Sequence, residues 1–205
     1  MELRFIDEFE HGIGWVREDD AFRRASHAVR IGDSVWLTDV LDGPGIDERI
    51  AQLGGEPKAV IQLLDRHDRD CSAVASRIGI PLHETPFAGV PGAPFEVIPV
   101  VRSRFWKEVA LWFPAERILA VGDALGTVGY FRAANEPVGV HPFLRLKPPR
   151  RAFAGLDPLH VLCGHGQGGH GEGVPEAVRQ ALATPRRRLP QALLNGLREA
   201  RRRPD

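Results

Sequence analysis

The sequence predicts one domain of mixed α/β or α+β structure. Short β-rich runs dominate the first half, a run with helical patterning follows them, and further strands and helices close the chain. The length of 205 residues is enough for a sizeable core, and 43% of the residues are hydrophobic, as is usual for a globular protein. No internal repeat or linker divides the chain, so we expect a single domain over residues 1–205.

The first predicted element is a β-hairpin. Two β-rich runs, residues 27–31 and 34–40, flank the dipeptide Gly-Asp, which is typical of hairpin turns. A short helix is expected over residues 46–54, where two adjacent glycines end the pattern. The apolar run KAVIQLL predicts a buried strand, and a helix that Asp70 caps is expected after it. This strand, this helix and a further short strand are expected at residues 58–64, 72–79 and 80–84.

The second half continues with loops, strands and two helices. A loop rich in proline and glycine leads into a strand, and KEVALWF and RILAVGD flank PAE as a second hairpin. Residues 137–149 contain four prolines and predict a loop. HVLCG predicts a last short strand, and the glycine-rich segment after it turns into a helix at Pro175, because proline is favourable in a first helical turn.

The charge of the chain is uneven, although its formal net charge is zero. Residues 141–205 carry a net charge of +7 and residues 1–140 a net charge of −7. A basic end of this kind fits nucleic acid or an anionic membrane. We favour a solvated surface helix at about residues 186–203 and expect neither partner, because Arg outnumbers Lys 24 to 3 along the whole chain. Four leucines at helical spacing are expected to dock this helix on the domain: Leu189, Leu193, Leu194 and Leu197.

Targeting and redox features predict a cytoplasmic protein. No apolar run approaches the length that spans a bilayer, and the start, MELRFIDEFE, is acidic where a signal peptide is basic. Cys71 and Cys163 are far apart in the sequence. Without a secretion signal, we expect them to be free thiols.

A dense charged cluster follows the strand predicted at residues 58–64. The six residues from Asp65 to Asp70, DRHDRD, are all charged or histidine. Such a cluster at the end of a buried strand is unfavourable unless a metal, a substrate or internal ion pairs compensate it. The cluster is therefore the first candidate for a functional site.

Four segments resemble, in this order, motifs of the metallo-β-lactamase superfamily. VWLTDV resembles the strand that ends in an aspartate, here Asp39, and the charged cluster resembles the histidine loop HxHxDH. RILAVGDAL supplies a Gly-Asp pair with Asp123, and HVLCGHG supplies a Gly-His-Gly turn with His165. The resemblance covers Leu3 to about Arg188 and implies a four-layer αββα sandwich with a site at one end of its two sheets. In that family two zinc or iron ions at this end activate a hydroxide.

The ligand positions that the resemblance implies are altered in this chain. The histidine of the third motif is replaced by Ser103 or Arg104, of which we favour Arg104. An arginine therefore stands at each of the two metal positions. The first position comprises Asp65, His67 and Arg104, the second comprises Arg69, Asp70 and His165, and Asp123 lies between them.

Arginine changes the chemistry of such a site. Its guanidinium has no free lone pair and stays protonated, so it cannot ligate a metal and it places a fixed positive charge where the cation would sit. Clustered carboxylates benefit from that charge, because bidentate hydrogen bonds from arginine relieve their repulsion. The residues thus predict a salt-bridge cluster in which Arg69 and Arg104 replace the metals and pair with Asp65, Asp70 or Asp123.

The remaining residues each have a structural alternative. His67 is expected to be a hydrogen-bonded structural histidine rather than a ligand, and Asp39 is expected to hold the loop after its strand. His165 fits either a ligand or a residue retained for the tight glycine turn. A thiolate from Cys71 or Cys163 would rescue a metal site only if the local register slips by one residue.

Two functions stay open, and enzymatic activity is left undecided. We favour a divergent member of the fold that has lost dinuclear hydrolysis, needs no cofactor and binds at most a small anionic or polar molecule through Arg69 and Arg104. The alternative is a hydrolase with one zinc or iron ion, because two histidines and a carboxylate suffice for one ion. The lost ligands and the nearby cations oppose this alternative. In this one-metal hydrolase, the ligands would come from Asp65, His67, Asp70, Asp123 and His165.

Overall fold

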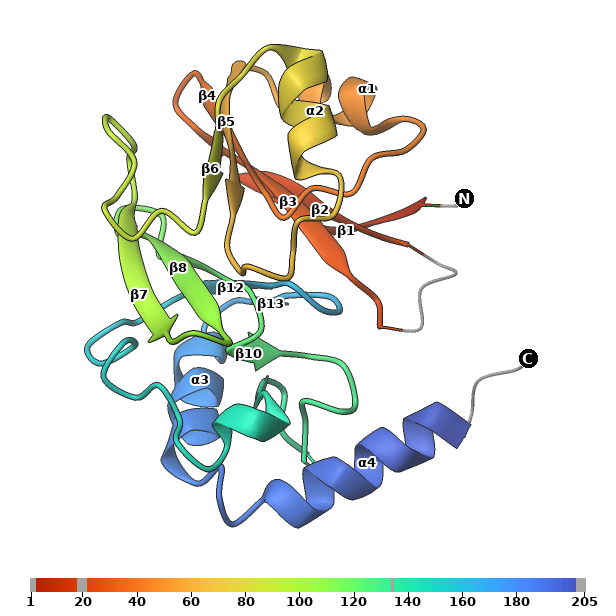
Figure 1. The fold of residues 1–205 in the computed structure, drawn as a ribbon, viewed down its shortest axis with the longest axis vertical. Coiled ribbons are helices and arrows are strands. Elements are labelled where there is room, and N and C mark those ends of the chain that lie inside the picture. The colour runs from red at the N-terminus through yellow and green to blue at the C-terminus, as the bar shows by residue number, and fades with distance from the viewer. Residues whose placement is uncertain (1–2, 18–21, 134, 202–205) are drawn as a thin grey trace.

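The computed structural model describes residues 3–17, 22–133 and 135–201. Its elements form four layers, with α1 and α2 on one side, two β-sheets in the middle and α3 on the other side (Figure 1). This arrangement confirms the expected αββα sandwich. None of the helices in the described ranges is long and apolar enough to cross a membrane. The helices span Ile46–Gln52 (α1), Cys71–Ile78 (α2), Val174–Ala183 (α3) and Leu189–Arg201 (α4).

The first sheet has six strands, ordered β1-β2-β3-β4-β5-β6. Strands β1 to β4 pair as antiparallel neighbours, whereas β5 runs parallel to both β4 and β6. Parallel neighbours need a crossover connection, and α1 and α2 provide the two crossovers. The strands span Leu3–Phe9 (β1), Gly12–Arg17 (β2), Ala25–Ile31 (β3), Ser34–Thr38 (β4), Glu56–Gln62 (β5) and Leu82–Glu84 (β6).

The second sheet has five strands, ordered β13-β12-β9-β8-β7. Only β9 and β12 are parallel within it, and the other neighbours are antiparallel. A two-stranded ribbon and the short 3-10 helix η1 lie between β9 and β12 in the chain. The elements span Glu96–Arg102 (β7), Lys107–Phe113 (β8), Ile118–Val121 (β9), Leu125–Gly126 (β10), Gly139–Val140 (β11), Pro142–Leu144 (η1), His160–Cys163 (β12) and Gly169–His170 (β13).

The two sheets pack face to face because their strands alternate between two buried faces. In β8, Val109, Leu111 and Phe113 belong to the core between the sheets, whereas Ala110 and Trp112 belong to the core beneath α3. This period of two is the geometry of a strand. Both faces are covered, which explains why KEVALWF is an almost continuous apolar run. Full burial of one such large side chain contributes about 1.5–3 kcal/mol.

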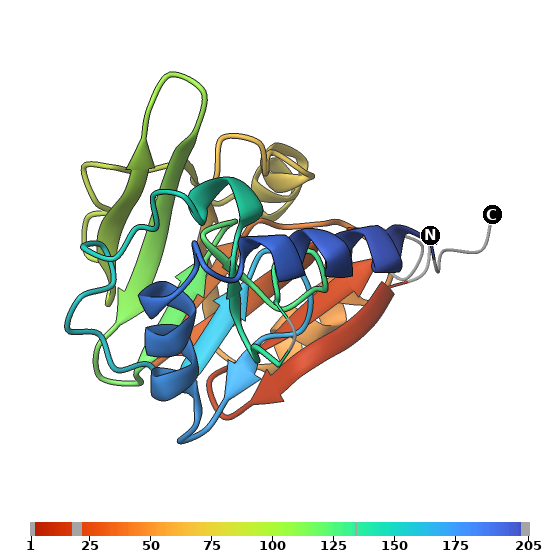
Figure 2. The same cartoon turned by 90° about the horizontal axis from the view of Figure 1, so that it is seen from below.

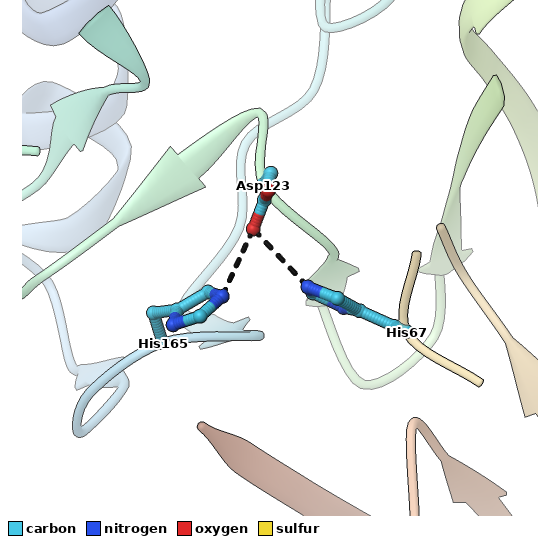
Figure 3. Close-up of side chains that lie close together, drawn as sticks. All are labelled: His67, Asp123 and His165. Carbon is cyan, nitrogen blue, oxygen red and sulfur yellow. Dashed lines mark ion pairs between the residues drawn. The ribbon is translucent and has the colours of Figure 1, made fainter. Parts of the chain in front are cut away.

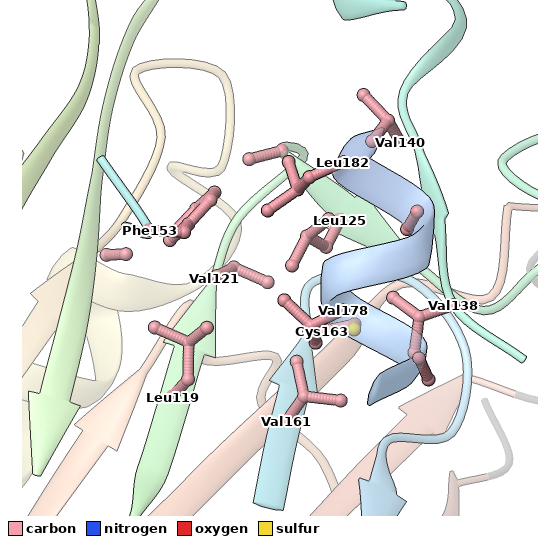
Figure 4. Packing of buried hydrophobic residues seen from close by; sticks show 14 of the residues in the cluster. Leu119, Val121, Leu125, Val138, Val140, Phe153, Val161, Cys163, Val178 and Leu182 are labelled. Atoms are coloured by element: carbon pink, nitrogen blue, oxygen red, sulfur yellow. The ribbon is translucent and has the colours of Figure 1, made fainter. Parts of the chain in front are cut away.

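Helix α3 covers the outer face of the second sheet. Val178 and Leu182 on the helix lie over Val121 of β9 and Val161 of β12 (Figure 4). The helix carries Pro175 in its first turn, as the sequence predicts. The buried contacts of α3 hold β9 and β12 together, and both strands lead into the candidate site.

Helix α4 docks differently from the sequence-based expectation. It lies on the α3 side of the molecule, in contact with η1 (Figures 1 and 2). Its small residues face the domain: Ala192 is fully buried, and a Cβ atom at Gly196 would come within 3.1 Å of Tyr130. The prediction that four leucines dock this helix on the domain is therefore wrong for three of them. Arg202 and Arg203, part of the predicted helix, lie outside the described residues. The exposed leucines are Leu193, Leu194 and Leu197, with 51%, 54% and 58% of their surface exposed.

The hairpin of β1 and β2 is an element that the sequence analysis did not predict. Gly12 and Gly14 weaken the strand signal of β2, since glycine has low β propensity. The structure needs glycine at Gly12, because a Cβ atom there would collide with the carbonyl of Ala28 on β3. Close approach of neighbouring backbones thus explains a residue that masks the strand in the sequence.

Candidate metal centre

Four polar residues follow four strands whose carboxyl ends lie at one edge of the sandwich. Asp39 follows β4 and His67 follows β5 in the first sheet, while Asp123 follows β9 and His165 follows β12 in the second. Strands β4 and β5 are parallel, as are β9 and β12, so the ends of each pair point the same way. The topology therefore gathers these side chains from positions far apart in the sequence.

His67, Asp123 and His165 converge on one point (Figure 3). His67 Nε2 lies 3.3 Å from Asp123 Oδ1, and His165 Nε2 lies 3.2 Å from the same oxygen. One potential ligand atom from each side chain lies within 4.8 Å of the other two, and all three residues are buried. In the part of the chain that the structure describes, no other group of three such residues meets in this way.

The far nitrogen of each imidazole is engaged in a hydrogen bond that orients the ring. His67 Nδ1 lies 2.7 Å from Oδ2 of Asp39, and His165 Nδ1 lies 2.8 Å from the main-chain carbonyl of Phe22. Since a carbonyl or carboxylate oxygen only accepts, both Nδ1 atoms carry the hydrogen. In the neutral rings the lone pairs then sit on Nε2 and face the Asp123 carboxylate. An oxygen that fixes the tautomer in this way is the usual support of a metal-binding histidine.

Asp123 carries the observation that favours a cation. Its Oδ1 atom is buried and lacks a hydrogen bond of acceptable geometry, despite the two nearby Nε2 atoms. Burial alone would raise the pKa of Asp123, but His165 and His67 hold it well below its usual range. The carboxylate is therefore ionised, and its buried Oδ1 atom faces both ring nitrogens at distances that are long for a charged hydrogen bond. These donors fit one metal ion, since two imidazoles and a carboxylate are suitable ligands for zinc or iron.

The electrostatics around His67 also favour a positive charge. Burial and the nearby Arg69 guanidinium lower the pKa of His67, but Asp39 and Asp123 outweigh them and raise it above its ordinary value. Either a proton on the imidazole or a bound cation satisfies the two carboxylates. The two occupants compete for the same Nε2 lone pair, so metal binding at this position releases a proton below the pKa of His67.

Asp39 connects the loops that carry the site. Its Oδ1 accepts a hydrogen bond from the main-chain N–H of Leu63 at 2.8 Å, while its Oδ2 bonds His67. Its backbone lies in the left-handed region with φ of 47°, which aspartate tolerates better than most residues. Asp39 holds the loop after β4, the role that the sequence favours, and it also positions an imidazole.

Arg69 does not replace a metal by pairing with the carboxylates. Its guanidinium donates to the main-chain carbonyls of Ala25, Asp39 (2.8 Å) and Gly164 (2.9 Å). These carbonyls belong to the start of β3 and to the ends of β4 and β12, so Arg69 ties both sheets together beneath the site. Its Nη2 also lies 3.3 Å from His67 Nδ1. The expected pairs with Asp65, Asp70 or Asp123 do not occur among the described contacts.

Arg104, Asp65 and Asp70 lie outside the cluster. The Arg104 guanidinium is exposed and packs over the Phe105 ring, 5.5 Å from its centroid. Asp65 is exposed and accepts a hydrogen bond from the Lys107 main-chain N–H at 3.2 Å. Asp70 occupies the N-cap position of α2 without capping it, because its Oδ2 accepts from the Asp42 main-chain N–H. The predicted ion-pair cluster of arginines and aspartates is therefore corrected to local loop contacts.

Arg66 is the arginine whose side chain reaches the Asp123 carboxylate, and the sequence analysis did not single it out. Its Nη2 atom lies 3.9 Å from Asp123 Oδ2, and its guanidinium stacks on Trp106 at 4.4 Å from the ring centroid. The side chain remains 46% exposed. Arg66 thus places a positive charge beside the cluster while staying accessible to a solute. Its motif position gave no signal, because it falls between ligand positions of the family pattern.

Glu108 is a second residue that the sequence analysis missed. It is fully buried on β8, where Trp106 Nε1 donates to one carboxylate oxygen at 2.8 Å and the Ala124 N–H to the other at 2.7 Å. Burial and the charge of Asp123 raise the pKa of Glu108 to about 7. The signal was present in KEVALWF, since a lone glutamate in an apolar strand must find buried partners.

Aromatic rings form one wall of the cluster, and the cysteines take no part in it. Tyr130 and Phe131 lie 6.0 and 5.9 Å from the His165 ring, measured between centroids. Cys71 and Cys163 are free thiols, as predicted, and burial raises the pKa of both, that of Cys71 to about 12. Neither thiol belongs to the group of ligand atoms that meets around Asp123. The ligand set is thus limited to two imidazoles and one carboxylate.

The chain has the metallo-β-lactamase fold, as its four layers and the position of the cluster at the strand ends indicate. The DIM-1 metallo-β-lactamase structure matches with a TM-score of 0.60, 13% sequence identity, and coverage of 95% of this chain and 98% of that one. A metallo-β-lactamase from Erythrobacter litoralis matches with a TM-score of 0.56 and 14% identity, covering 94% of this chain and 93% of that one.

A protein with a different role has the same fold. The apo state of the chemotaxis sensor ODP from T. denticola matches with a TM-score of 0.51 and 16% identity, covering 89% of this chain and 94% of that one. No protein-family model and no curated protein matches the sequence. At these identities the comparisons establish the fold.

Proposed function

We propose that this metallo-β-lactamase-fold chain binds a single zinc or iron ion through His67, Asp123 and His165 and acts as a mononuclear metal-dependent hydrolase. The observation that carries the proposal is the convergence of three buried ligand atoms, in which Oδ1 of Asp123 faces the Nε2 atoms of two imidazoles that are held in orientation by their Nδ1 hydrogen bonds. A buried, ionised carboxylate is unfavourable unless positive charge compensates it, and a metal ion held by the two neutral imidazoles supplies that charge.

A second ion beside the first, as in a dinuclear centre, has no comparable support. The positions that would complete a second ligand set are Asp65, Arg69, Asp70 and Arg104, and their side chains bind main-chain groups or lie in solvent. The two-metal chemistry of the fold therefore does not extend to this chain under the proposal. The sequence favours a metal-free protein. We propose the one-metal alternative instead, because the guanidinium groups of Arg69 and Arg104 do not lie among His67, Asp123 and His165.

The residues of the chain have separate tasks in the proposed site. When bound, the ion lowers the pKa of a water molecule and polarises a scissile bond. Asp39 and the Phe22 carbonyl keep the two Nε2 atoms directed at the ion, and Arg69 braces the loops that hold them. The exposed guanidinium of Arg66 is placed to bind an anionic or polar group of the substrate.

The fold itself leaves two roles open, since it occurs in both a β-lactamase and a chemotaxis sensor. Hydrolysis is favoured by the composition of the ligand set, because three protein ligands leave a coordination position for water. The partly exposed Arg66 next to Asp123 adds a substrate contact beside that position.

The proposal is tested by metal titration coupled to an activity screen. We expect chelator-treated protein to bind one Zn²⁺ tightly at this centre, and His67→Gln, Asp123→Asn and His165→Gln each to weaken that binding strongly. His83→Gln changes a histidine on β6 that does not belong to the converging group, and this matched control is expected to keep full affinity. Zinc- and iron-loaded protein is then assayed on ester, lactam and phosphodiester substrates. Metal binding without turnover of any class would support a sensor role and contradict the hydrolase.

A further inference from the structure

A second pair of histidines faces each other at the opposite end of β12. His160 begins β12 and His170 ends β13, and the two are direct cross-strand partners in the antiparallel ladder. His165 of the candidate metal centre follows the other end of β12. The two histidine groups are therefore separated by the length of a strand.

The imidazoles of this pair are already at ligand spacing. The Nδ1 atoms of His160 and His170 lie 2.9 Å apart. Two nitrogens bound tetrahedrally to one zinc ion, each at about 2.0–2.1 Å from it, are separated by roughly 3.3 Å. The rings need to part by only a few tenths of an ångström to accept an ion. In the free protein the contact is a hydrogen bond in which the hydrogen on His160 Nδ1 points to His170 Nδ1.

Asp7 fixes which nitrogen of His170 is free. His170 Nε2 lies 3.2 Å from Asp7 Oδ1, and a carboxylate oxygen only accepts, so Nε2 carries the hydrogen and Nδ1 presents its lone pair to His160. Asp7 is itself held rigidly, since both its oxygens accept from the Gly168 N–H and its Oδ2 lies 3.2 Å from His27 Nε2. A carboxylate behind a histidine in this arrangement raises the affinity of the histidine for a metal.

Packing restrains the pair while leaving it accessible. The Phe9 ring lies 4.7 Å from His160 and 5.0 Å from His170, measured between centroids, and limits the rotation of both rings. The His170 side chain keeps 27% of its surface exposed, so an ion can reach it from solvent. The His11 ring lies 6.1 Å from the Phe9 ring, measured between centroids, and offers one more imidazole nearby.

We propose that His160 and His170 form a second site for a divalent transition-metal ion such as Zn²⁺, Ni²⁺ or Cu²⁺, with Asp7 as the positioning residue of His170. On binding, the hydrogen of His160 moves from Nδ1 to Nε2 by exchange with solvent, and both Nδ1 lone pairs coordinate the ion. Water completes the coordination. The site uses none of the residues of the candidate metal centre, so metal binding at His160 and His170 does not depend on the proposed function.

The test is a Ni²⁺ and Zn²⁺ titration of the Asp123→Asn protein with His67→Gln added, so that the other centre keeps His165 as its one remaining ligand. We expect one ion per chain by calorimetry, with affinity at least about tenfold weaker in His160→Gln and in His170→Gln, and weakened about 10–100-fold in Asp7→Asn. His83→Gln again serves as the control and is expected to bind unchanged. A folded protein with Asp123→Asn and His67→Gln that binds no ion, or binding that survives both His160→Gln and His170→Gln, would overturn the proposal and leave the pair as a hydrogen bond only.

A second measurement covers the case in which a variant does not fold. Substoichiometric Cu²⁺ broadens the NMR signals of imidazoles that it binds, and the unmodified chain suffices for this experiment. Broadening of His160 and His170 that persists after the other centre is filled with Zn²⁺ supports the proposal. Sharp signals from both rings under those conditions contradict it.

Discussion

His67 Nδ1 lies 2.7 Å from Oδ2 of Asp39, a residue 28 positions earlier in the chain. The same carboxylate accepts the Leu63 N–H through its other oxygen. One aspartate therefore fixes both the tautomer of a candidate ligand and the path of the loop that carries it. Metal affinity at the site should depend on a residue that would not touch the metal.

Replacing Asp39 by Asn tests this dependence. An amide has one accepting oxygen, so it cannot accept from both His67 and Leu63, and one of the two hydrogen bonds is lost. We expect zinc affinity, measured by competition with a chelating dye, to fall about 10–100-fold. Asp42→Asn, in the same loop and paired with the exposed Arg77, is the matched control. Equal affinities in the two variants would contradict the role of Asp39.

The two arginines of the family positions should differ sharply in their effect on folding. Arg69→Met removes hydrogen bonds to three main-chain carbonyls that join the sheets, and we expect a loss on the order of 3 kcal/mol in the free energy of unfolding. Arg104→Met, on the exposed Phe105 ring, should change it by less than about 0.5 kcal/mol. Urea denaturation of both variants measures the difference, and similar losses would show that the contacts are misassigned.

A methyl group at Gly164 should displace a candidate ligand. A Cβ atom there would lie 2.7 Å from His67 Cε1 and 2.8 Å from the Gly122 carbonyl oxygen. We expect Gly164→Ala to weaken zinc binding and to lower the free energy of unfolding by about 1–3 kcal/mol through overpacking. At Gly173 no atom lies within 4 Å of an added Cβ, so Gly173→Ala should cost under about 1 kcal/mol and leave zinc affinity intact. Unchanged zinc affinity in Gly164→Ala would contradict the position of the His67 ring next to Gly164.

Glu108 should give the metal-free protein a specific pH dependence. Burial and Asp123 raise its pKa from 4.5 to about 7 in the folded state. Between these values the folded state keeps a proton that the unfolded state has released, so this contribution to stability is present at low pH and is lost as pH rises toward 7. The loss is on the order of 3 kcal/mol.

Glu108→Gln isolates that contribution. Glutamine does not titrate, so its unfavourable contact with the two N–H donors is the same at every pH. We expect the stability of chelated wild type to fall relative to Glu108→Gln between pH 5 and pH 8 in urea denaturation. Groups that do not interact with Glu108 titrate alike in both proteins and cancel in the difference. Parallel pH profiles of the free energy of unfolding in the two proteins would mean that ionisation of Glu108 does not destabilise the folded state.

The sequence placed the strand ends correctly because its motifs mark where buried strands stop. Asp39, His67, Asp123 and His165 each follow such an end, and the parallel pairing of the strands brings them to one edge. The hairpin of β1 and β2 was not predicted, because Gly12 is required by the close approach of the β3 backbone at Ala28 and glycine weakens the strand pattern. No local pattern in the sequence encodes that neighbour.

Long side chains were the less predictable part of the site. The resemblance to the family motifs put Arg69 and Arg104 at metal positions, but a guanidinium reaches several ångströms from its Cα atom, and local partners decide its direction. The Arg69 guanidinium donates to main-chain carbonyls, and the Arg104 guanidinium packs over the exposed Phe105 ring. Arg66, between the motif positions, reaches Asp123. The Phe22 carbonyl that orients His165 leaves no trace in any side-chain motif, because it is a main-chain group.

Elemental analysis of protein purified without chelator tests the central claim most directly. The measurement uses His160→Gln, so that an ion at the second histidine pair does not enter the count. The account predicts about one zinc or iron ion per chain, and its loss when Asp123→Asn is added to the same protein. A folded protein that stays metal-free after exposure to excess zinc, or one that holds two ions per chain, would contradict a mononuclear centre at His67, Asp123 and His165.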